Sequence, residues 1–230
     1  MKKVLITAPL RQEVKIFLEY QKSLDNLIIP DGVEVDRFFV VNDCPEIIPF
    51  IKGRYTVINS GDEFIKNEKQ HVWAWANIIK MPILRNRTIE EAKKYDYWFS
   101  VDTDLILHPL TLKTLIEADK DIISEVFFTD NWCNAWMYDQ CDMDGKINQW
   151  KQAGLYRVGM TGACTLVKTE VFEHVDYTPI PNIRYSLVGE DRHFSIRAAC
   201  AGFEMWLDTH YPAEHLYTEE AYQNYMRKKR

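Results

Sequence analysis

An apolar, aromatic run that ends in two closely spaced carboxylates constrains the fold of this chain most. Residues 95–101 read Tyr-Asp-Tyr-Trp-Phe-Ser-Val, Asp102-Thr103-Asp104 follows, and residues 105–107 are apolar again. Aromatic and β-branched residues in this arrangement predict a buried strand. Side chains two positions apart on a strand point the same way. We therefore expect Asp102 and Asp104 to leave the strand end together, with Thr103 facing elsewhere.

Two carboxylates at the edge of an apolar sheet are costly to hold unless a cation neutralises them. Hard oxygen ligands suit Mg²⁺ or Mn²⁺, so a divalent metal that carries a diphosphate fits Asp102 and Asp104. The alternative is a pair of helix-capping aspartates ahead of the next helix. A second string of this kind, Asp142-Met143-Asp144, lies in a polar stretch before Gly145, and we expect it to be a turn.

Length and composition narrow the class of protein. The 230 residues are 47% apolar and contain no repeat or linker, which favours a single globular domain. A net charge of −6 argues against nonspecific nucleic-acid binding. No apolar run is long enough for a membrane span, and charges interrupt the first apolar run too soon for a signal peptide. The five scattered cysteines, without C-x-x-C spacing, indicate a reduced, cytoplasmic protein without a zinc site.

Strand patterns alternate with helical patterns along the chain. The predicted strands cover residues 3–7 (ended by Ala8-Pro9), 33–41, 55–59, the run before Asp102, 121–128, 158–167 and 206–207. The predicted helices begin at residue 10, cover 71–94 with an interruption near Pro82, follow Pro109, and cover 190–201, while 208–215 reads as a loop. This alternation predicts an α/β fold with a mostly parallel sheet flanked by helices. In such sheets ligands bind beyond the carboxyl ends of the strands, where Thr7, Asp43 and Asp102 are expected to lie.

Gly189-Glu190-Asp191 begins the last long predicted helix. Carboxylates at this position can simply cap free amides and meet the positive end of the helix dipole. Asp191, however, shares a helix face with the apolar residues Phe194, Ala198 and Ala201. We therefore expect Asp191 to lie on or near the inward face, where it could open into a cleft.

Three further features are candidates for binding. His215 lies close to His210, and the sequence alone does not distinguish the two as ligands. A group of aromatic residues could stack a sugar ring or simply hold a loose segment to the domain; its members are Trp132, Trp136, Tyr138 and Trp150. The basic tail, residues 227–230, could touch an anionic membrane surface, although a solvated terminus is favoured.

The order of these motifs resembles a known family. Arg85-Asn86, the strand with Asp102-Thr103-Asp104, a glycine-rich strand, Gly189-Glu190-Asp191 and a late histidine follow one another. In this order, from about Lys3 to Tyr217, the chain resembles nucleotide-sugar-dependent glycosyltransferases of the GT-A fold, most like glycosyltransferase family 2 and its relatives. The resemblance implies a single Rossmann-like GT-A domain over residues 1–230. Its nucleotide-binding half would cover about 1–107, its donor and acceptor half about 108–217, and its tail 218–230.

The resemblance also implies a role for each matching residue. Asp104 would ligate the metal together with His215, and Asp102 would contact the metal and the ribose or donor sugar. Asp191 would be the catalytic base, and Glu190 would bind the acceptor. The residues that would hold the nucleotide sugar are Thr7, Pro9 and Arg11 at the first turn, Asp43 at the base or ribose, Arg85 at the diphosphate, and Thr161 and Gly162 beneath the sugar.

The implied activity is metal-dependent transfer of a sugar from a UDP- or GDP-type donor to a hydroxyl of a carbohydrate or lipid-linked acceptor, with Mn²⁺ or Mg²⁺ as the metal. With Asp191 as base, the reaction would invert the anomeric centre. A retaining glycosyltransferase and a catalytically inactive sugar-nucleotide-binding protein are the alternatives. A nucleotidyltransferase is disfavoured, because the turn over residues 7–11 has no glycine with which to cradle a phosphate.

Overall fold

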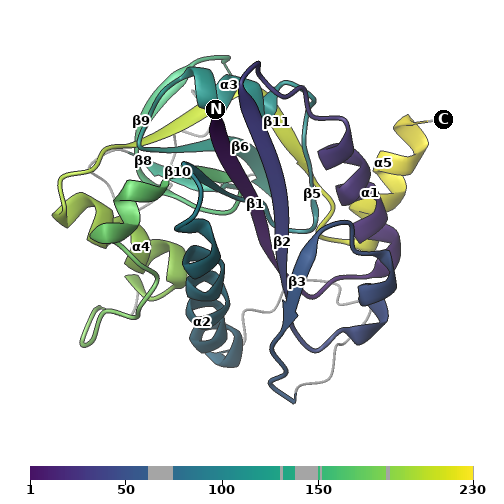
Figure 1. The fold of residues 1–230 in the computed structure, drawn as a ribbon, viewed down its shortest axis with the longest axis horizontal. Coiled ribbons are helices and arrows are strands. Elements are labelled where there is room, and N and C mark those ends of the chain that lie inside the picture. Colours follow the sequence, from purple (N-terminus) through teal and green to yellow (C-terminus); the bar gives the residue numbers. More distant parts are fainter. Residues whose placement is uncertain (62–74, 130–131, 138–149, 151, 185–186, 230) are drawn as a thin grey trace.

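Eleven strands form one mixed sheet in the part of the chain that the computed structural model describes, residues 1–61, 75–129, 132–137, 150, 152–184 and 187–229 (Figure 1). The strands are β1 (Lys2–Leu10), β2 (Val33–Val41), β3 (Arg54–Val57), β4 (Tyr97–Ser100), β5 (Leu105–Ile106), β6 (Ile122–Thr129), β7 (Trp132–Cys133), β8 (Ala135–Met137), β9 (Leu155–Thr161), β10 (Thr165–Lys168) and β11 (Met205–His215). Their order is β3-β2-β1-β4-β10-β6-β11-β9-β8. Outside this order, β5 pairs with β11 and β7 pairs with β6.

Most long strands share one direction. β1 is parallel to β2 and β4, β2 to β3, and β6 to β11. β10 lies antiparallel between β4 and β6, so β6 and β11 run in the same direction as β4. This arrangement confirms the mostly parallel sheet that the sequence predicts, and it brings the carboxyl ends of these strands to one edge.

Helices cover both faces of the sheet. They are α1 (Val14–Asp25), α2 (Trp75–Ala92), α3 (Thr111–Glu117), α4 (Glu190–Cys200) and α5 (Glu219–Lys228), with 3₁₀ turns η1 (Pro45–Phe50) and η3 (Thr169–Glu173). In Figure 1, α2 and α4 lie to one side of the sheet and α1 and α5 to the other. The buried side chains divide in the same way: Ile6 packs with Phe17 of α1, whereas Leu5 packs in the cluster that holds Leu84 of α2 and Phe194 of α4. Successive residues of β1 thus point to opposite faces of the sheet and pack in different hydrophobic clusters.

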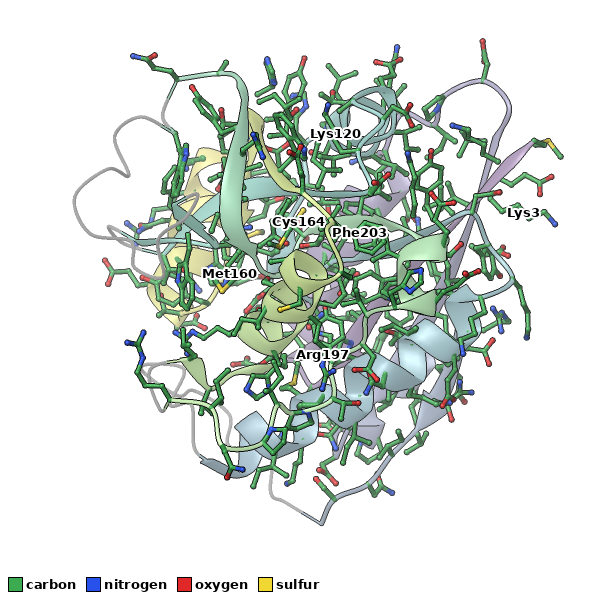
Figure 2. All side chains as sticks on the ribbon, turned by 90° about the vertical axis from the view of Figure 1, so that its left-hand side faces the viewer. Lys3, Lys120, Met160, Cys164, Arg197 and Phe203 are labelled. Atoms are coloured by element: carbon green, nitrogen blue, oxygen red, sulfur yellow. The ribbon has the colours of Figure 1, made fainter. Side chains whose placement is uncertain are left out.

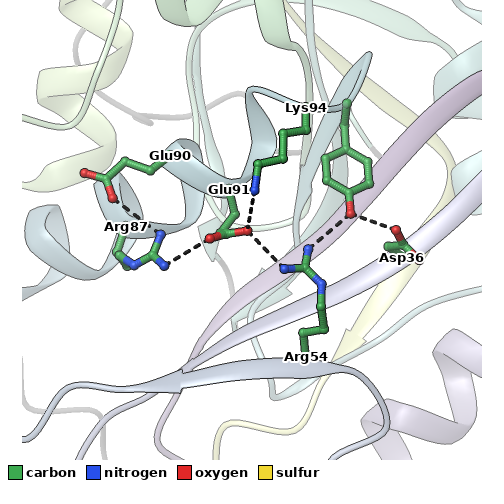
Figure 3. Close-up of polar contacts among 7 residues, drawn as sticks. Asp36, Arg54, Arg87, Glu90, Glu91 and Lys94 are labelled. Carbon is green, nitrogen blue, oxygen red and sulfur yellow. Dashed lines mark hydrogen bonds and ion pairs between the residues drawn. The ribbon is translucent and has the colours of Figure 1, made fainter.

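A surface network of ion pairs and hydrogen bonds joins α2 to β3 through Glu91 and Arg54, and joins Tyr95, just after the helix, to β2 (Figure 3). Arg54 of β3 and Arg87 of α2 each contact Glu91 at 3.0 Å, and the Tyr95 hydroxyl donates to Asp36 of β2 at 2.7 Å. Exposed pairs of this kind contribute about 0.2–1 kcal/mol each, so their effect is to orient the helix. The opposite face of α2 is turned towards the site described below.

β1 runs through Pro9, although the sequence predicts that Ala8-Pro9 ends it. The carbonyl oxygen of Thr7 accepts a hydrogen bond from Val101 N, and that of Leu10 accepts one from Asn42 N. Alternate residues of β1 therefore face β4 and β2, and Pro9 faces the side where β4 has already ended. Its missing N–H removes no hydrogen bond from the ladder, which is why proline is tolerated here.

α2 continues through Pro82, so the predicted interruption is wrong. Proline removes one backbone donor and crowds the preceding turn, which bends or breaks many helices. Here Leu84 and Ile89, beyond the proline, are buried in the core between α2 and the sheet and hold that part of the helix in place. The continuous helix brings Arg85 to the end of β4.

Residues 158–167 form two strands, β9 and β10, where a single strand is predicted. The connecting turn contains Ala163 and Cys164, whose φ angles of 46° and 21° are unusual for residues with a side chain. Small residues are compatible with both a strand and a turn, so the pattern did not reveal the break. Because Thr165 pairs with Ser100, this turn lies beside the end of β4.

Residues 208–215 belong to β11, where a loop is predicted. The pairing with β6 shifts between Asp208 and Ala213, and this irregularity destroys the alternating pattern that would indicate a strand. Beyond it the strand resumes, and Glu214 and His215 pair with Ile106 and Leu105 of β5.

The C-terminal tail forms α5. The helix begins at Thr218, whose hydroxyl accepts a hydrogen bond from Ala221 N at 3.1 Å. Lys229 contacts Glu19 of α1 at 2.6 Å, and Lys228 contacts Glu214 at 3.4 Å. Two of the basic groups in the tail therefore have acidic partners within the chain.

Part of the segment that carries the aromatic group is described, namely β7, β8 and Trp150. Tyr138 and the turn predicted at Asp142-Met143-Asp144 lie outside the described residues. Among the helices that the structure describes, none combines the length and the apolar character needed to span a membrane.

Candidate active site

The Asp102-Thr103-Asp104 string directly follows β4, all four residues of which are buried. The chain turns here, with Leu105 N donating to Asp102 O at 3.1 Å. Thr103 and Asp104 are buried, whereas 37% of the Asp102 side chain is exposed. The alternation expected of a strand therefore does not apply, because these residues form a turn at the sheet edge.

Arg85 of α2 lies directly beneath this turn. Its guanidinium donates to Ser100 Oγ and, at 2.8 Å, to Asp102 Oδ1, and the side chain is almost wholly buried. Burial by itself would lower the pKa of Arg85, but the charges of Asp102, Asp191 and Glu190 raise it. Arg85 therefore remains a cation, and it lies within electrostatic reach of the aspartate string and of the start of α4.

Glu190 and Asp191 occupy the first turn of α4, which begins after Gly189. Burial raises the pKa of Glu190, and the positive charge of Arg85 opposes this shift. Burial also raises the pKa of Asp191 well above its usual range, the neighbouring Glu190 adds to the shift, and Arg85 opposes it. Asp102 and the two carboxyl groups at the start of α4, which lie far apart in the sequence, are thus within electrostatic reach of the same cation, Arg85.

Gly162 lies against Asp191. A Cβ atom at this glycine would be 2.6 Å from Asp191 Oδ2, so only glycine allows this close approach. The carbonyl oxygen of Gly162 is held by Asn134, whose Nδ2 donates to it at 2.9 Å and to Glu125 O at 3.0 Å. Asn134 also accepts from Phe127 N, so it joins the turn after β9 to β6. Our sequence analysis missed Asn134, and its only signal there is a polar residue within an aromatic segment.

His215, and not His210, lies beside Asp104. His215 Nε2 is 3.4 Å from Asp104 Oδ2, and its Nδ1 is 2.8 Å from the hydroxyl of Thr129. The pairing of β11 with β5 brings the histidine to this position. His210 instead contacts Asp208 at 2.9 Å and has a more exposed side chain.

A divalent metal fits Asp104 and His215. No cluster of three or more His, Cys, Asp or Glu side chains arranged to hold a metal occurs among the described residues, and Asp102 is bonded to Arg85. Mg²⁺ and Mn²⁺ sites often use one or two protein ligands, with substrate phosphates and water completing the shell. The Thr129 hydroxyl would keep His215 Nε2 directed at such a metal, in the manner of outer-shell partners.

The residues predicted to hold the nucleotide lie at the carboxyl ends of β1 and β2. Pro9 and Arg11 are partly exposed, whereas Thr7 is fully buried. Asp43 accepts hydrogen bonds from Asn42, Gly61 and Ser60, which fill both carboxylate oxygens. Although its slight burial opposes ionisation, the hydrogen bonds from Ser60 and Gly61 lower the pKa of Asp43, and the charge of Arg11 contributes. Asp43 therefore remains ionised and holds the loop that contains Ser60.

The predicted sugar floor and aromatic group are only partly accessible. Thr161 is buried, and its hydroxyl has no hydrogen-bond partner among the described residues. Trp150 is buried in the core beneath α4, in agreement with the alternative that it holds the segment to the domain. Trp136 is also largely buried and lies under the guanidinium of Arg192, whereas the side chain of Trp132 lies outside the described residues. The sequence analysis did not single out Arg192.

Comparison with solved structures identifies the fold. The chain is similar to a crystal structure of S. aureus TarS residues 1–349 (TM-score 0.56, 16% identity, 99% of this chain and 64% of that one). It is also similar to the mannosyltransferase PcManGT from Pyrobaculum calidifontis, with a TM-score of 0.59 and 11% identity over 99% of this chain and 61% of that one. A third similar structure is GalNAc-T7, with a TM-score of 0.61 and 13% identity over 96% of this chain and 45% of that one. This chain spans less than two thirds of the length of each of these structures. No family model and no curated protein matches its sequence.

These similarities confirm the GT-A fold that the sequence resemblance implied. At such low identity they concern the fold alone. The chemistry must therefore be argued from the residues at the edge of the sheet.

Proposed function

We propose that this protein is a glycosyltransferase that moves a sugar from a nucleoside-diphosphate sugar to an acceptor hydroxyl, with inversion of the anomeric centre. The observation that carries the proposal is the gathering of Asp102, Glu190 and Asp191 around the buried guanidinium of Arg85. The fold supports the same donor class, since similar structures contain UDP-GlcNAc, GDP-Man with Mn²⁺, or UDP with Mn²⁺.

Asp191 would be the general base. Its burial and the charge of Glu190 raise its pKa, so its ionised form is a stronger base than an exposed carboxylate. Gly162 leaves the space that this carboxylate needs. A positioned base of this kind typically contributes about 10²–10⁴-fold to the rate. Glu190, next to it, would bind the acceptor.

Arg85 would hold the donor side of the site in place. Its guanidinium fixes Asp102 at 2.8 Å and offsets part of the negative charge that three carboxylates bring to the crevice. An anionic diphosphate is easier to bind when the acidic cluster is partly neutralised in this way. Holding both substrates in attack geometry can lower the barrier by several kcal/mol.

Asp104 and His215 would hold a divalent metal through Asp104 Oδ2 and His215 Nε2. When bound, the metal stabilises the negative charge that develops on the leaving diphosphate. Thr129 keeps the imidazole in position through Nδ1. Arg11, Pro9 and Asp43 would border the nucleotide at the ends of β1 and β2.

Two substitutions test the proposal. In Asp191→Asn, metal-dependent donor binding should survive while transfer falls by about 10²-fold or more. In Asp104→Ala, nucleotide affinity should lose its dependence on Mn²⁺. Asp31→Asn, in an exposed turn, is the matched control and should behave like the wild type. Transfer by Asp191→Asn at the wild-type rate would refute the assignment of the base.

Two further measurements separate the alternatives. Proton NMR of the first-formed glycosidic bond reports its anomeric configuration, and retention would reject the inverting mechanism. Release of nucleoside diphosphate from a panel of UDP and GDP sugars with Mn²⁺ reports turnover. A catalytically inactive binding protein would bind donors but release no product from any of them.

A further inference from the structure

Arg192, the residue after the proposed base, carries a guanidinium that has no carboxylate partner among the described residues. Its Nη1 donates to the carbonyl oxygen of Val188 at 2.6 Å, and its Cζ lies 5.0 Å from the ring centre of Trp136. Within the described part of the chain, no aspartate or glutamate oxygen is close enough to Arg192 to form an ion pair. Arg197 on the same helix, and Arg157 on β9, each have a carboxylate partner.

Arg192 and Trp136, the ring on which its guanidinium lies, border the proposed site. Trp136 of β8 pairs with Met160 of β9, which lies two residues before Gly162, the glycine that contacts Asp191. α4, with Arg197, packs beside β9, with Met160 (Figure 2). The charge of Arg192 also opposes the raised pKa values of Glu190 and Asp191, so it acts on both carboxyl groups.

The guanidinium of Arg192 is held in place, but not all of its hydrogen-bond donors have partners among the described residues. Trp136 is only 7% exposed and so forms a rigid support, and the Nε atom of Arg192 is buried without a hydrogen-bond partner in the described chain. Ordering a long side chain costs conformational entropy, and a buried donor without a partner costs further free energy. An anion bound by the outer nitrogens of the guanidinium would offset the cost of ordering the side chain, whereas the buried Nε is out of reach of a ligand. Guanidinium groups bind phosphate and carboxylate oxygens with paired hydrogen bonds.

We propose that Arg192, supported by Trp136, binds an anionic oxygen group of the acceptor, so that this protein glycosylates sugar phosphates or acidic glycans in preference to neutral sugars. The inference rests on the proposed function, because it assigns the acceptor side of the same site. Trp136, which supports Arg192, pairs with the strand that leads to Gly162, so an anion held by Arg192 would lie on the same side of the site as the proposed base Asp191.

Matched acceptors test this preference. We would compare methyl glycosides of glucose, galactose and N-acetylglucosamine with their 6-phosphates, and the first two also with their uronates. The donor would be the one hydrolysed fastest. The expected wild-type result is a kcat/KM at least about tenfold higher for a phosphate or a uronate than for its neutral partner, as for hydrogen bonds to charged groups. The two series distinguish phosphate from carboxylate.

Substitutions test whether Arg192 is responsible for the preference for anionic acceptors. Arg192→Gln should reduce the ratio of anionic to neutral kcat/KM to near one, and Arg192→Lys, which keeps the charge but not the fork, should retain part of it. Arg157→Gln, which removes another arginine from its exposed ion pair, should keep the wild-type ratio. The melting temperature of each variant confirms that it is folded.

Three results would overturn the inference: no anionic preference in any pair, an unchanged ratio in Arg192→Gln, or an effect of this variant on donor KM with no effect on the ratio. Donor hydrolysis without acceptor is measured in parallel. If no donor releases nucleoside diphosphate, the proposed function fails and the acceptor assignment fails with it. If donors are hydrolysed but anionic acceptors gain nothing, only the assignment of Arg192 fails.

Discussion

Asp191 Oδ2 lies 2.6 Å from the position that a Cβ atom on Gly162 would occupy. This distance is shorter than real Cβ contacts allow, so the glycine and the carboxylate are matched to each other. The turn that carries Gly162 is itself held by Asn134 at 2.9 Å. The carboxylate that we propose as base is therefore positioned by the absence of one methyl group.

We expect Gly162→Ala to displace Asp191 and to lower transfer by at least about tenfold, because a misplaced base loses part of its typical 10²–10⁴-fold contribution. Mn²⁺-dependent binding of the nucleoside diphosphate, which lacks the sugar expected above Gly162, should change little, since Asp104 and His215 lie on other strand ends. Steady-state kinetics and nucleotide titration would measure the two effects. Gly154→Ala is the control, because its Cβ would meet only the ring of Tyr156, at 3.1 Å. Equal losses in both variants would contradict a specific role for Gly162.

His215→Ala should weaken Mn²⁺-dependent binding of nucleoside diphosphate by at least about tenfold, since even outer-shell partners of metal ligands are typically worth 10–100-fold. Thr129→Val should give a smaller loss, because it removes only the contact to Nδ1. Calorimetric titration of UDP and GDP with and without Mn²⁺ measures both. His210→Ala, remote from Asp104, should bind as the wild type does, and a similar loss in this variant would reject the choice of histidine.

Arg85→Met should be among the more destabilising substitutions in the chain. The substitution leaves the buried Ser100 hydroxyl without its donor and leaves Asp102, which is 37% exposed, without its ion-pair partner, so we expect a loss of about 1–3 kcal/mol. The pKa values of Glu190 and Asp191 should also rise further, since Arg85 opposes their upward shift. Urea denaturation measures the first effect. The rise in the two pKa values is measured from the pH dependence of the transfer rate, whose acid limb should move to higher pH.

Arg87→Met is the matched control for Arg85, because Arg87 lies on the outer face of α2 in exposed pairs with Glu90 and Glu91 (Figure 3). It should cost no more than about 1 kcal/mol and leave the pH profile in place. A large destabilisation by Arg87→Met, or an unchanged acid limb in Arg85→Met, would contradict the assignment.

Local patterns predicted the elements that carry the site. The apolar run before Asp102 is a buried strand, and α4 begins after Gly189, as the sequence predicts. These signals are local, because an apolar run and a helix terminus depend on neighbouring residues. The resemblance also indicates that these acidic pairs serve one site, which stays a prediction; in the fold the charges of Asp102, Glu190 and Asp191 all act on Arg85.

Long-range pairing produced the errors. The predicted strand at 206–207 is part of β11, but its continuation from Asp208 was missed because the irregularity after Asp208 breaks the alternation, and the last residues are strand only because β5 and β6 provide partners. Pro9 lies in a strand because its neighbour β4 ends first. Asn134 gave only a weak local signal and Arg192 none, since their roles depend on contacts with Gly162 and Trp136.

Glu125 of β6 is a buried carboxyl group that has no role in the proposed transfer reaction. It is fully buried, its Oε2 has no hydrogen-bond partner among the described residues, and it pairs in register with Asp208 of β11. Burial, and to a lesser degree the charge of Asp208, raises the pKa of Glu125 to about 9. The folded protein therefore keeps a proton on Glu125 at neutral pH that the unfolded chain releases.

We expect this proton to make the fold less stable as the pH rises. Between the unfolded pKa of 4.5 and the folded value of about 9, the folded state binds more protons, so Glu125 lowers the free energy of unfolding by up to about 1.4 kcal/mol per pH unit. Glu125→Gln, which cannot ionise, should unfold at higher urea than the wild type at pH 8, with a smaller difference at pH 5. Glu90→Gln, at an exposed position, should keep the wild-type dependence. A Glu125→Gln variant with the wild-type slope would show that Glu125 ionises freely in the folded protein.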